Sequence, residues 1–187
     1  PNGRPFYGGT YFPKDQWHHV LKQLVHIQQT EPEKLVEYSD HLTEGIENAE
    51  SLDIAPISTF PKEDLVEAIR KWKHQFDWKL GGMNRAPKFP MPNNYMFLQE
   101  YGELAADKDV LEFVDTTLTK MARGGIYDQL GGGFCRYSVD ALWKVPHFEK
   151  MLYDNGQLLS LYAKAFARTG NPEYEWICKG IISFVDE

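Results

Sequence analysis

The sequence predicts a mainly α-helical protein whose helices pair into hairpins, with one short β-hairpin near the start of the chain. Three observations predict this class. Apolar residues recur at helical spacing through most of the chain. Two segments repeat the same order of features: a glycine pair, an irregular aromatic and basic loop, a proline, and an amphipathic helix. With 187 residues, 42% of them hydrophobic, the chain is long enough to bury a core.

Charge and cysteine content exclude several classes of partner. The formal net charge of −7 comes from dispersed acids, and no basic stretch is present, which argues against nucleic acid or an anionic membrane surface as a partner. No apolar run approaches the roughly 18 residues that span a bilayer, and no signal-peptide pattern opens the chain. Cys135 and Cys178 match no metal or redox spacing and indicate buried or incidental thiols, which fits a reducing, cytoplasmic setting. The sequence indicates neither a metal nor a cofactor.

The first fifty residues divide into a short β segment and two helices. Asn2-Gly3 is a turn signal, and the aromatic run that follows predicts a strand or hairpin from Arg4 to Phe12. Helical spacing begins at Asp15, a residue suited to the N-cap. A second helix is expected from Pro32 to Ala49.

A linker is expected over residues 51–60. This segment loses the helical spacing and contains a proline and several small polar residues. Pro61 opens the next helix, which is expected to run to about Phe76. The expected domains are therefore 1–50 and 61–187, joined by this linker.

The two repeated segments start from glycine pairs at Gly81 and Gly132, which lie 51 positions apart. The second segment carries roughly ten more residues before its helix, and this excess is a candidate for an inserted β-hairpin. A chance match of common glycine pairs is the alternative. Repeated helical hairpins either stack as an open solenoid or close into an α/α toroid, where the loops at one end gather around a funnel.

The segment from Gly124 to Asn155 holds most of the side chains suited to chemistry. Its triple glycine allows close approach of another group, but it matches no phosphate-loop or dinucleotide-binding spacing. Phe134, Tyr137 and Trp143 offer flat faces on which a sugar could stack, although aromatic loop residues more often cover the ends of helices.

Four acids and one histidine of this segment are candidates for catalysis. Two carboxylates across a pocket would suit glycoside hydrolysis, and the local ones are Asp128, Asp140, Glu149 and Asp154. His147 is the best candidate for proton transfer near neutral pH, as an epimerase or isomerase needs, with a capping or packing role as the alternative.

A helix is expected to begin at Pro146, because proline suits the first helical turn. Its polar side chains would fall on two faces, with His147, Lys150 and Asp154 on one, and Glu149 and Tyr153 on the other. If the helix start faces a funnel, these groups form a site. If it faces outward, Lys150 and Asp154 form an ordinary surface ion pair.

Further side chains are candidates for binding a ligand. Arg136, Lys150 and Tyr153 join the aromatic residues of the second segment. In the first segment, Arg85 and Lys88 stand between prolines. They either bind an anionic or polyhydroxy ligand or solubilise a rigid loop.

The motifs "RPFYGGTYFPK", "APKFP", "GGIYDQLGGGFCRYSVD" and "VPHFEKMLYDN", with Trp143, cover most of the chain in order. Together they resemble the thioredoxin-domain-containing family that includes spermatogenesis-associated protein 20 of animals and many bacterial relatives. The resemblance implies a thioredoxin-like domain followed by an α/α toroid similar to six-hairpin glycosidases and N-acylglucosamine 2-epimerase. Residues 1–50 would be the C-terminal hairpin and helix of the first domain. The family's cysteine pair would lie before Pro1, so no thiol–disulfide activity is expected of this chain.

The leading hypothesis is a fragment of a carbohydrate-binding or carbohydrate-active toroid protein, epimerase-like or glycosidase-like, acting on a sugar or another polyhydroxy small molecule. The alternative is a redox or chaperone-like protein whose toroid is a client-binding or structural scaffold. Kinship of fold transfers function poorly, so the reaction and the substrate stay open. A partial toroid would expose inner helix faces, so self-association or partial disorder is expected.

Overall fold

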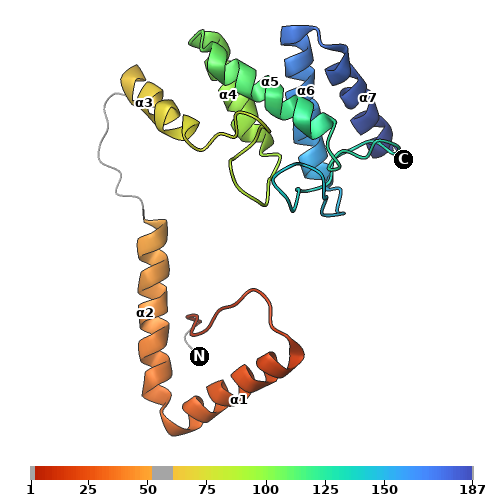
Figure 1. Cartoon of the computed structure of the whole chain (residues 1–187). Helices are drawn as coiled ribbons and strands as arrows, with labels where there is room; N and C mark the ends of the chain where they lie inside the picture. The colour runs from red at the N-terminus through yellow and green to blue at the C-terminus, as the bar shows by residue number, and fades with distance from the viewer. Residues whose placement is uncertain (1–2, 52–60, 187) are drawn as a thin grey trace. The chain divides into compact units, whose positions relative to one another are not determined.

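The computed structural model describes residues 3–51 and 61–186 (Figure 1). Within these residues the protein is mainly helical, as predicted, with seven helices and no strand longer than an isolated bridge. The chain divides into two compact units: unit 1, Pro1–Phe60, and unit 2, Pro61–Glu187. The helices are α1 (Lys14–Thr30), α2 (Pro32–Glu50), α3 (Lys62–Lys73), α4 (Pro92–Leu104), α5 (Lys108–Ala122), α6 (Leu152–Thr169) and α7 (Pro172–Asp186).

Unit 1 consists of an irregular segment followed by α1 and α2. Residues 3–13 form no strand, so the β-hairpin predicted for Arg4 to Phe12 is wrong. Side-chain contacts hold this segment instead: the ring centroids of Phe12 and Trp17 lie 5.4 Å apart, and Arg4 forms an ion pair with Asp40 of α2. α2 begins at Pro32 as predicted, since the first helical position needs no N–H. Residues 52–60 of the predicted linker lie outside the described residues.

Unit 2 holds the hydrophobic core. α4 packs against both α5 and α6, and α6 packs against α7. The apolar faces of these helices meet in one buried cluster, and α3 adds Ile69 to it. α3 itself ends at Lys73, three residues before the predicted end at Phe76. The largest buried side chains are mostly aromatic: Trp143, Tyr95, Tyr127, Tyr162 and Tyr174.

The helix predicted to begin at Pro146 begins instead at Leu152, as α6. Backbone pairing explains the difference, because residues 145–149 lie extended against residues 136–139. An isolated bridge joins Ser138 and Pro146, so the inserted segment forms the short β-like hairpin expected of it. Three N–H groups donate across it: Val139 to Val145 O (2.8 Å), His147 to Tyr137 O (2.9 Å), and Arg136 to Glu149 O (2.8 Å). Consequently His147, Glu149 and Lys150 lie on a loop and not on a helix.

Unit 2 contains the same loop twice: loop A (residues 76–83) before α4, and loop B (residues 127–134) before α6. In each loop an antiparallel bridge joins the first residue to the last. This bridge pairs Phe76 with Met83 in loop A and Tyr127 with Phe134 in loop B. The internal hydrogen bonds also match. Asp77 N–H donates to Gly82 O and Gly81 N–H to Asp77 O (both 2.8 Å), while Asp128 N–H donates to Gly133 O and Gly132 N–H to Asp128 O (both 2.9 Å). The repeat predicted from the glycine pairs is thus confirmed, in the predicted register.

A lysine from farther along the chain closes each loop. Lys88 Nζ donates to Asp77 Oδ2 (2.7 Å) and Gly81 O (2.6 Å). Lys150 Nζ donates to the equivalent atoms of loop B, Asp128 Oδ2 (2.5 Å) and Gly132 O (2.9 Å). The two closures differ in exposure, because the side chain of Lys88 is fully buried whereas that of Lys150 is 21% exposed.

An aromatic ring covers each lysine. Trp143 lies with its ring centroid 5.5 Å from Lys88 Nζ, and Phe184 of α7 lies 4.7 Å from Lys150 Nζ. The same rings press on the second glycine of each pair, where a Cβ would lie 2.5 Å from Trp143 at Gly82 and 2.6 Å from Phe184 at Gly133. Both glycines also have positive φ (+73° and +76°). The glycine pairs are therefore required by packing and backbone conformation.

Candidate functional site

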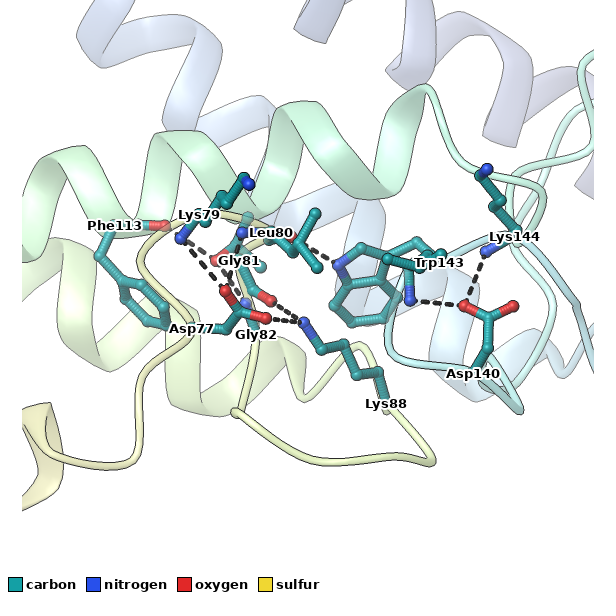
Figure 2. A network of polar contacts seen from close by, with 12 residues as sticks. Asp77, Lys79, Leu80, Gly81, Gly82, Lys88, Phe113, Asp140, Trp143 and Lys144 are labelled. Carbon is teal, nitrogen blue, oxygen red and sulfur yellow. Dashed lines mark hydrogen bonds and ion pairs between the residues drawn. The ribbon is translucent and has the colours of Figure 1, made fainter.

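Three of the predicted ligand-binding residues belong to the core. Phe134 is fully buried and stacks on Tyr162, with centroids 5.4 Å apart. Trp143 is also fully buried and donates its Nε1–H to Leu80 O at 2.9 Å, beside the Lys88–Asp77 pair (Figure 2). Lys88 is 1% exposed. Contact of a ligand with any of the three would require the core to open.

Asp140, a predicted catalytic residue, organises the turn that carries Trp143 (Figure 2). Its carboxylate accepts backbone N–H groups from Leu142 (2.5 Å), Val145 (2.7 Å) and Lys144 (3.3 Å). Partial burial favours the protonated carboxyl and opposes a low pKa. The three backbone donors nevertheless lower the pKa of Asp140, because they stabilise the charged carboxylate. The carboxylate is thus occupied in holding the turn.

Asp128 is held in a similar way in loop B. Its Oδ1 accepts N–H groups from Leu130 (3.0 Å) and Gly131 (2.9 Å), while its Oδ2 binds Lys150. The hydrogen bond from Lys150, followed by those from Gly131 and Leu130, lowers the pKa of Asp128 to about 2.

The acid stability of unit 2 is expected to depend on Asp128. Its folded-state pKa of about 2 lies below the ordinary value of 3.8. The ionised carboxylate therefore stabilises the fold above pH ~4, and this contribution is lost as the pH falls from ~4 to ~2. Urea unfolding midpoints measured between pH 2 and pH 6 should fall less steeply in Asp128→Asn than in the original chain. Equal slopes would show that Asp128 does not contribute.

A stack of three rings lies at the loop end of unit 2. Tyr137 stacks on both Phe89 (ring centroids 4.7 Å apart) and His147 (4.8 Å). Phe89 follows loop A, whereas Tyr137 and His147 come from the paired segments after loop B. Reciprocal backbone hydrogen bonds between Lys88 and Ser138, both 2.8 Å, hold the two parts together. Phe89 and His147 stay accessible to a ligand, because Phe89 is 41% exposed and His147 is also exposed.

Two charged residues, Arg136 and Glu149, lie close in sequence to the rings of the stack. The side chains of Arg136 and Glu149 approach to 3.7 Å, with 46% and 56% of their surface exposed. A long, exposed pair of this kind contributes little to stability, so both groups remain available to a ligand.

Asp154 is the third residue of α6 and lacks the expected pairing with Lys150, which Asp128 holds instead. Its Oδ2 is shielded from solvent and has no hydrogen-bond partner within the described part of the chain. Burial raises the pKa of Asp154, although Arg136 opposes the shift. We refer to Phe89, Arg136, Tyr137, His147, Glu149 and Asp154 together as the loop surface.

Apolar side chains are exposed around the loop surface. Phe148 is 87% exposed and Leu152 is 67% exposed. Val145 and the predicted binding residue Tyr153 are each about half exposed. These apolar side chains are therefore not packed into the core and are free to contact another molecule.

Sequence reasoning missed two residues, Phe89 and Asp77. Phe89 comes from the first repeat, so only the folded chain brings it to Tyr137. The sequence does contain a signal for Asp77. An aromatic residue followed by an aspartate precedes both glycine pairs at the same distance, in "FDWKLGG" and "YDQLGGG".

Neither a metal cluster nor a membrane-spanning helix is seen in residues 3–51 and 61–186. No group of three His, Cys, Asp or Glu side chains there is arranged to hold a metal ion. No helix in that part of the chain is long and apolar enough to cross a membrane. Cys135 and Cys178 are free thiols, and burial raises the pKa of each.

Unit 2 is thus a helical structure in which the same loop twice precedes a helical hairpin. The chain is 35% identical to spermatogenesis-associated protein 20 of Homo sapiens over 197 aligned residues, covering 99% of this chain and 25% of that protein. It is 34% identical to the protein of that name from Mus musculus, with the same coverage. An uncharacterized protein of Caenorhabditis elegans is 38% identical over 170 residues, covering 87% of this chain.

No protein-family model matches the chain. The chain spans about a quarter of the length of the curated relatives it matches.

Proposed function

We propose that the chain is part of a protein of the spermatogenesis-associated protein 20 family. In this proposal unit 1 is the end of a thioredoxin-like domain, and unit 2 begins an α/α toroid like those of six-hairpin glycosidases and N-acylglucosamine 2-epimerase. Similarity along 99% of the chain supports the family, and the successive hairpins α4–α5 and α6–α7 support the toroid. The loops before α4 and α6 lie at the same end of these helices (Figure 1), where a toroid has its funnel.

In the same proposal, the loop surface binds a carbohydrate or another polyhydroxy small molecule. The observation that carries this is the accessible stack of Phe89, Tyr137 and His147, with the Arg136–Glu149 pair on the same paired segments. Aromatic faces suit the C–H faces of a sugar ring. A guanidinium donates hydrogen bonds to hydroxyl groups, and a carboxylate accepts them.

Asp154, His147 and Glu149 would be the groups that move protons if the ligand is turned over. The raised pKa of Asp154 keeps more of it protonated near neutral pH than an ordinary aspartate, as a general acid requires. His147 would serve as the base beside a carbonyl in an epimerase or isomerase. A glycosidase would instead use Asp154 with Glu149 across the bond that breaks.

Binding to the loop surface is expected to depend on Phe89. Calorimetric titration of the chain with a panel of neutral, amino and acidic sugars should reveal at least one ligand. Phe89→Ala should then weaken its binding at least 10-fold, about 1.4 kcal/mol, because one ring of the stack is lost. Phe97→Ala is a matched control, since Phe97 on α4 is also 41% exposed and should not affect binding. Binding of no sugar, or equal loss in both variants, would contradict the proposal.

A second candidate function is the binding of polypeptide clients. The exposed apolar side chains of Phe148 and Leu152 favour it, because a contiguous apolar surface marks a protein contact. Titration of the same chain with a reduced, unfolded polypeptide separates the two candidates. Polypeptide binding that Phe148→Ser weakens, without any sugar binding, would favour this second function.

A further inference from the structure

Asn155 joins the start of α6 to the end of loop B. It is the fourth residue of α6 and is fully buried. Its Oδ1 accepts the backbone N–H of Phe134 (2.7 Å), and its Nδ2 donates to Phe134 O (3.0 Å) and Met151 O (3.0 Å). The side-chain amide therefore pairs with Phe134 in both directions, as a neighbouring strand would.

Loop B packs closely around this amide. A Cβ at Gly133 would lie 3.3 Å from Asn155 Oδ1, and the ring of Phe134 stacks on Tyr162 of the same helix. An aspartate in place of Asn155 would keep the acceptor and lose both donors. An alanine would lose all three hydrogen bonds and leave the buried N–H of Phe134 without this acceptor.

Two groups of the loop surface lie on either side of this joint. Asp154 immediately precedes Asn155 on α6. Arg136 lies two residues after Phe134, where its backbone N–H donates to Glu149 O at 2.8 Å. The charge of Arg136 acts on Asp154, because it opposes the rise in the pKa of Asp154 that burial causes. The two side chains therefore interact across the joint that Asn155 makes.

The environment of Asp154 depends on this joint. Its Oδ2 is shielded from solvent and has no hydrogen-bond partner among the described residues. A carboxyl stays protonated to a higher pH only while water is kept from it. If the first turn of α6 could move relative to residues 134–136, water would reach this oxygen.

We propose that Asn155 is a positioning residue of the loop surface, which fixes Asp154 relative to Arg136 and keeps water from the Asp154 carboxyl. Asn155 is buried and acts only through these two residues. The inference rests on the proposed function, in which Asp154 donates a proton. A proton donor needs such support, because a misplacement of about 1 Å can cost roughly 100-fold in rate.

A pH titration of the Asp154 carboxyl, followed by ¹³C NMR of the 187-residue chain, tests this assignment. In Asn155→Ala the midpoint is expected to fall toward the ordinary value of 3.8. Burial is the larger of the two effects on this carboxyl, so its loss outweighs a weaker contact with Arg136. An unchanged midpoint in Asn155→Ala would overturn the proposal.

Thr117→Val is the matched control. Thr117 is fully buried on α5, where its Oγ1 accepts the N–H of Gly82 (2.9 Å) and donates to Phe113 O (2.8 Å). The variant removes buried side-chain hydrogen bonds at loop A, so it should lower the urea midpoint of unfolding without moving the titration of Asp154. Equal shifts of that titration in both variants would mean that it follows general stability, which would overturn the positioning role.

A measurement on the original chain keeps the test valid if Asn155→Ala does not fold. The backbone amide of Phe134 should shift with the same midpoint as the Asp154 carboxyl, because Asn155 holds the two together. A Phe134 amide that does not respond would contradict the assignment. Neither measurement needs a ligand, so failure of every sugar to bind would contradict the proposed function alone.

Discussion

Replacing Trp143 with alanine is expected to lower the free energy of unfolding of unit 2 by about 3–5 kcal/mol, the usual cost of deleting a buried large aromatic side chain. The ring is fully buried and packs against Gly82 and the stem of Lys88. Its Nε1–H also donates to Leu80 O, which loses that donor in the variant. Because Trp143 follows loop B and covers loop A, its loss removes one of the contacts between the two repeats.

Urea unfolding followed by far-UV circular dichroism measures this effect. Trp176→Ala is the control, since this tryptophan of α7 is 49% exposed and should cost less than half as much. Trp143→Phe should fall between the two, because it keeps a ring but loses the Nε1 hydrogen bond. Similar losses for Trp143→Ala and Trp176→Ala would mean that Trp143 does not join the repeats as described.

Lys88→Met is expected to cost about 3–5 kcal/mol, the usual result of removing one partner of a buried ion pair. Asp77, whose side chain is 12% exposed, would keep its charge without the Lys88 ammonium. Gly81 O would lose the same donor. Burial opposes ionisation of Asp77, and the hydrogen bond from Lys88 is a main reason that its pKa is nevertheless lowered.

The second repeat supplies the matched control, Lys150→Met. This change removes the equivalent contacts in loop B, but the side chains of Lys150 and Asp128 are 21% and 35% exposed. Water can solvate the remaining carboxylate, so a loss of only about 1 kcal/mol is expected. In loop A, the double variant Asp77→Asn with Lys88→Met should recover part of the stability. Equal losses of stability for Lys88→Met and Lys150→Met would contradict the claim that the burial of each lysine sets the cost of removing it.

The helices could be predicted because their signals are local. Apolar spacing located α1, α2 and α3, and Pro32 marked the first residue of α2. The start of α6 was misplaced for a nonlocal reason. Pro146 suits a first helical turn, but backbone hydrogen bonds from residues 136–139 hold it extended. The β-hairpin expected from Arg4 to Phe12 does not form, because β-favouring residues alone do not supply the paired strands that a hairpin needs.

The candidate site was predicted in part. His147 and Tyr137 were expected in one block of sequence, and the structure brings their rings together. Lys88 and Trp143 were predicted to bind a ligand, with solubilising a rigid loop as the alternative for Lys88 and covering the ends of helices as the alternative for Trp143. Their burial depends on Asp77 and Gly82 of loop A, which no local pattern connects to them.

The most direct test of the loop surface is a ¹H–¹⁵N NMR titration of the chain with the sugar panel, at ligand concentrations up to ~10 mM, ten times a dissociation constant of 1 mM. The expected result is saturable shift changes concentrated at the amides of Tyr137, His147, Glu149 and Asp154, with none in α2 or α5. Shift changes confined to other elements, or none with any sugar, would contradict a polyhydroxy ligand at this surface.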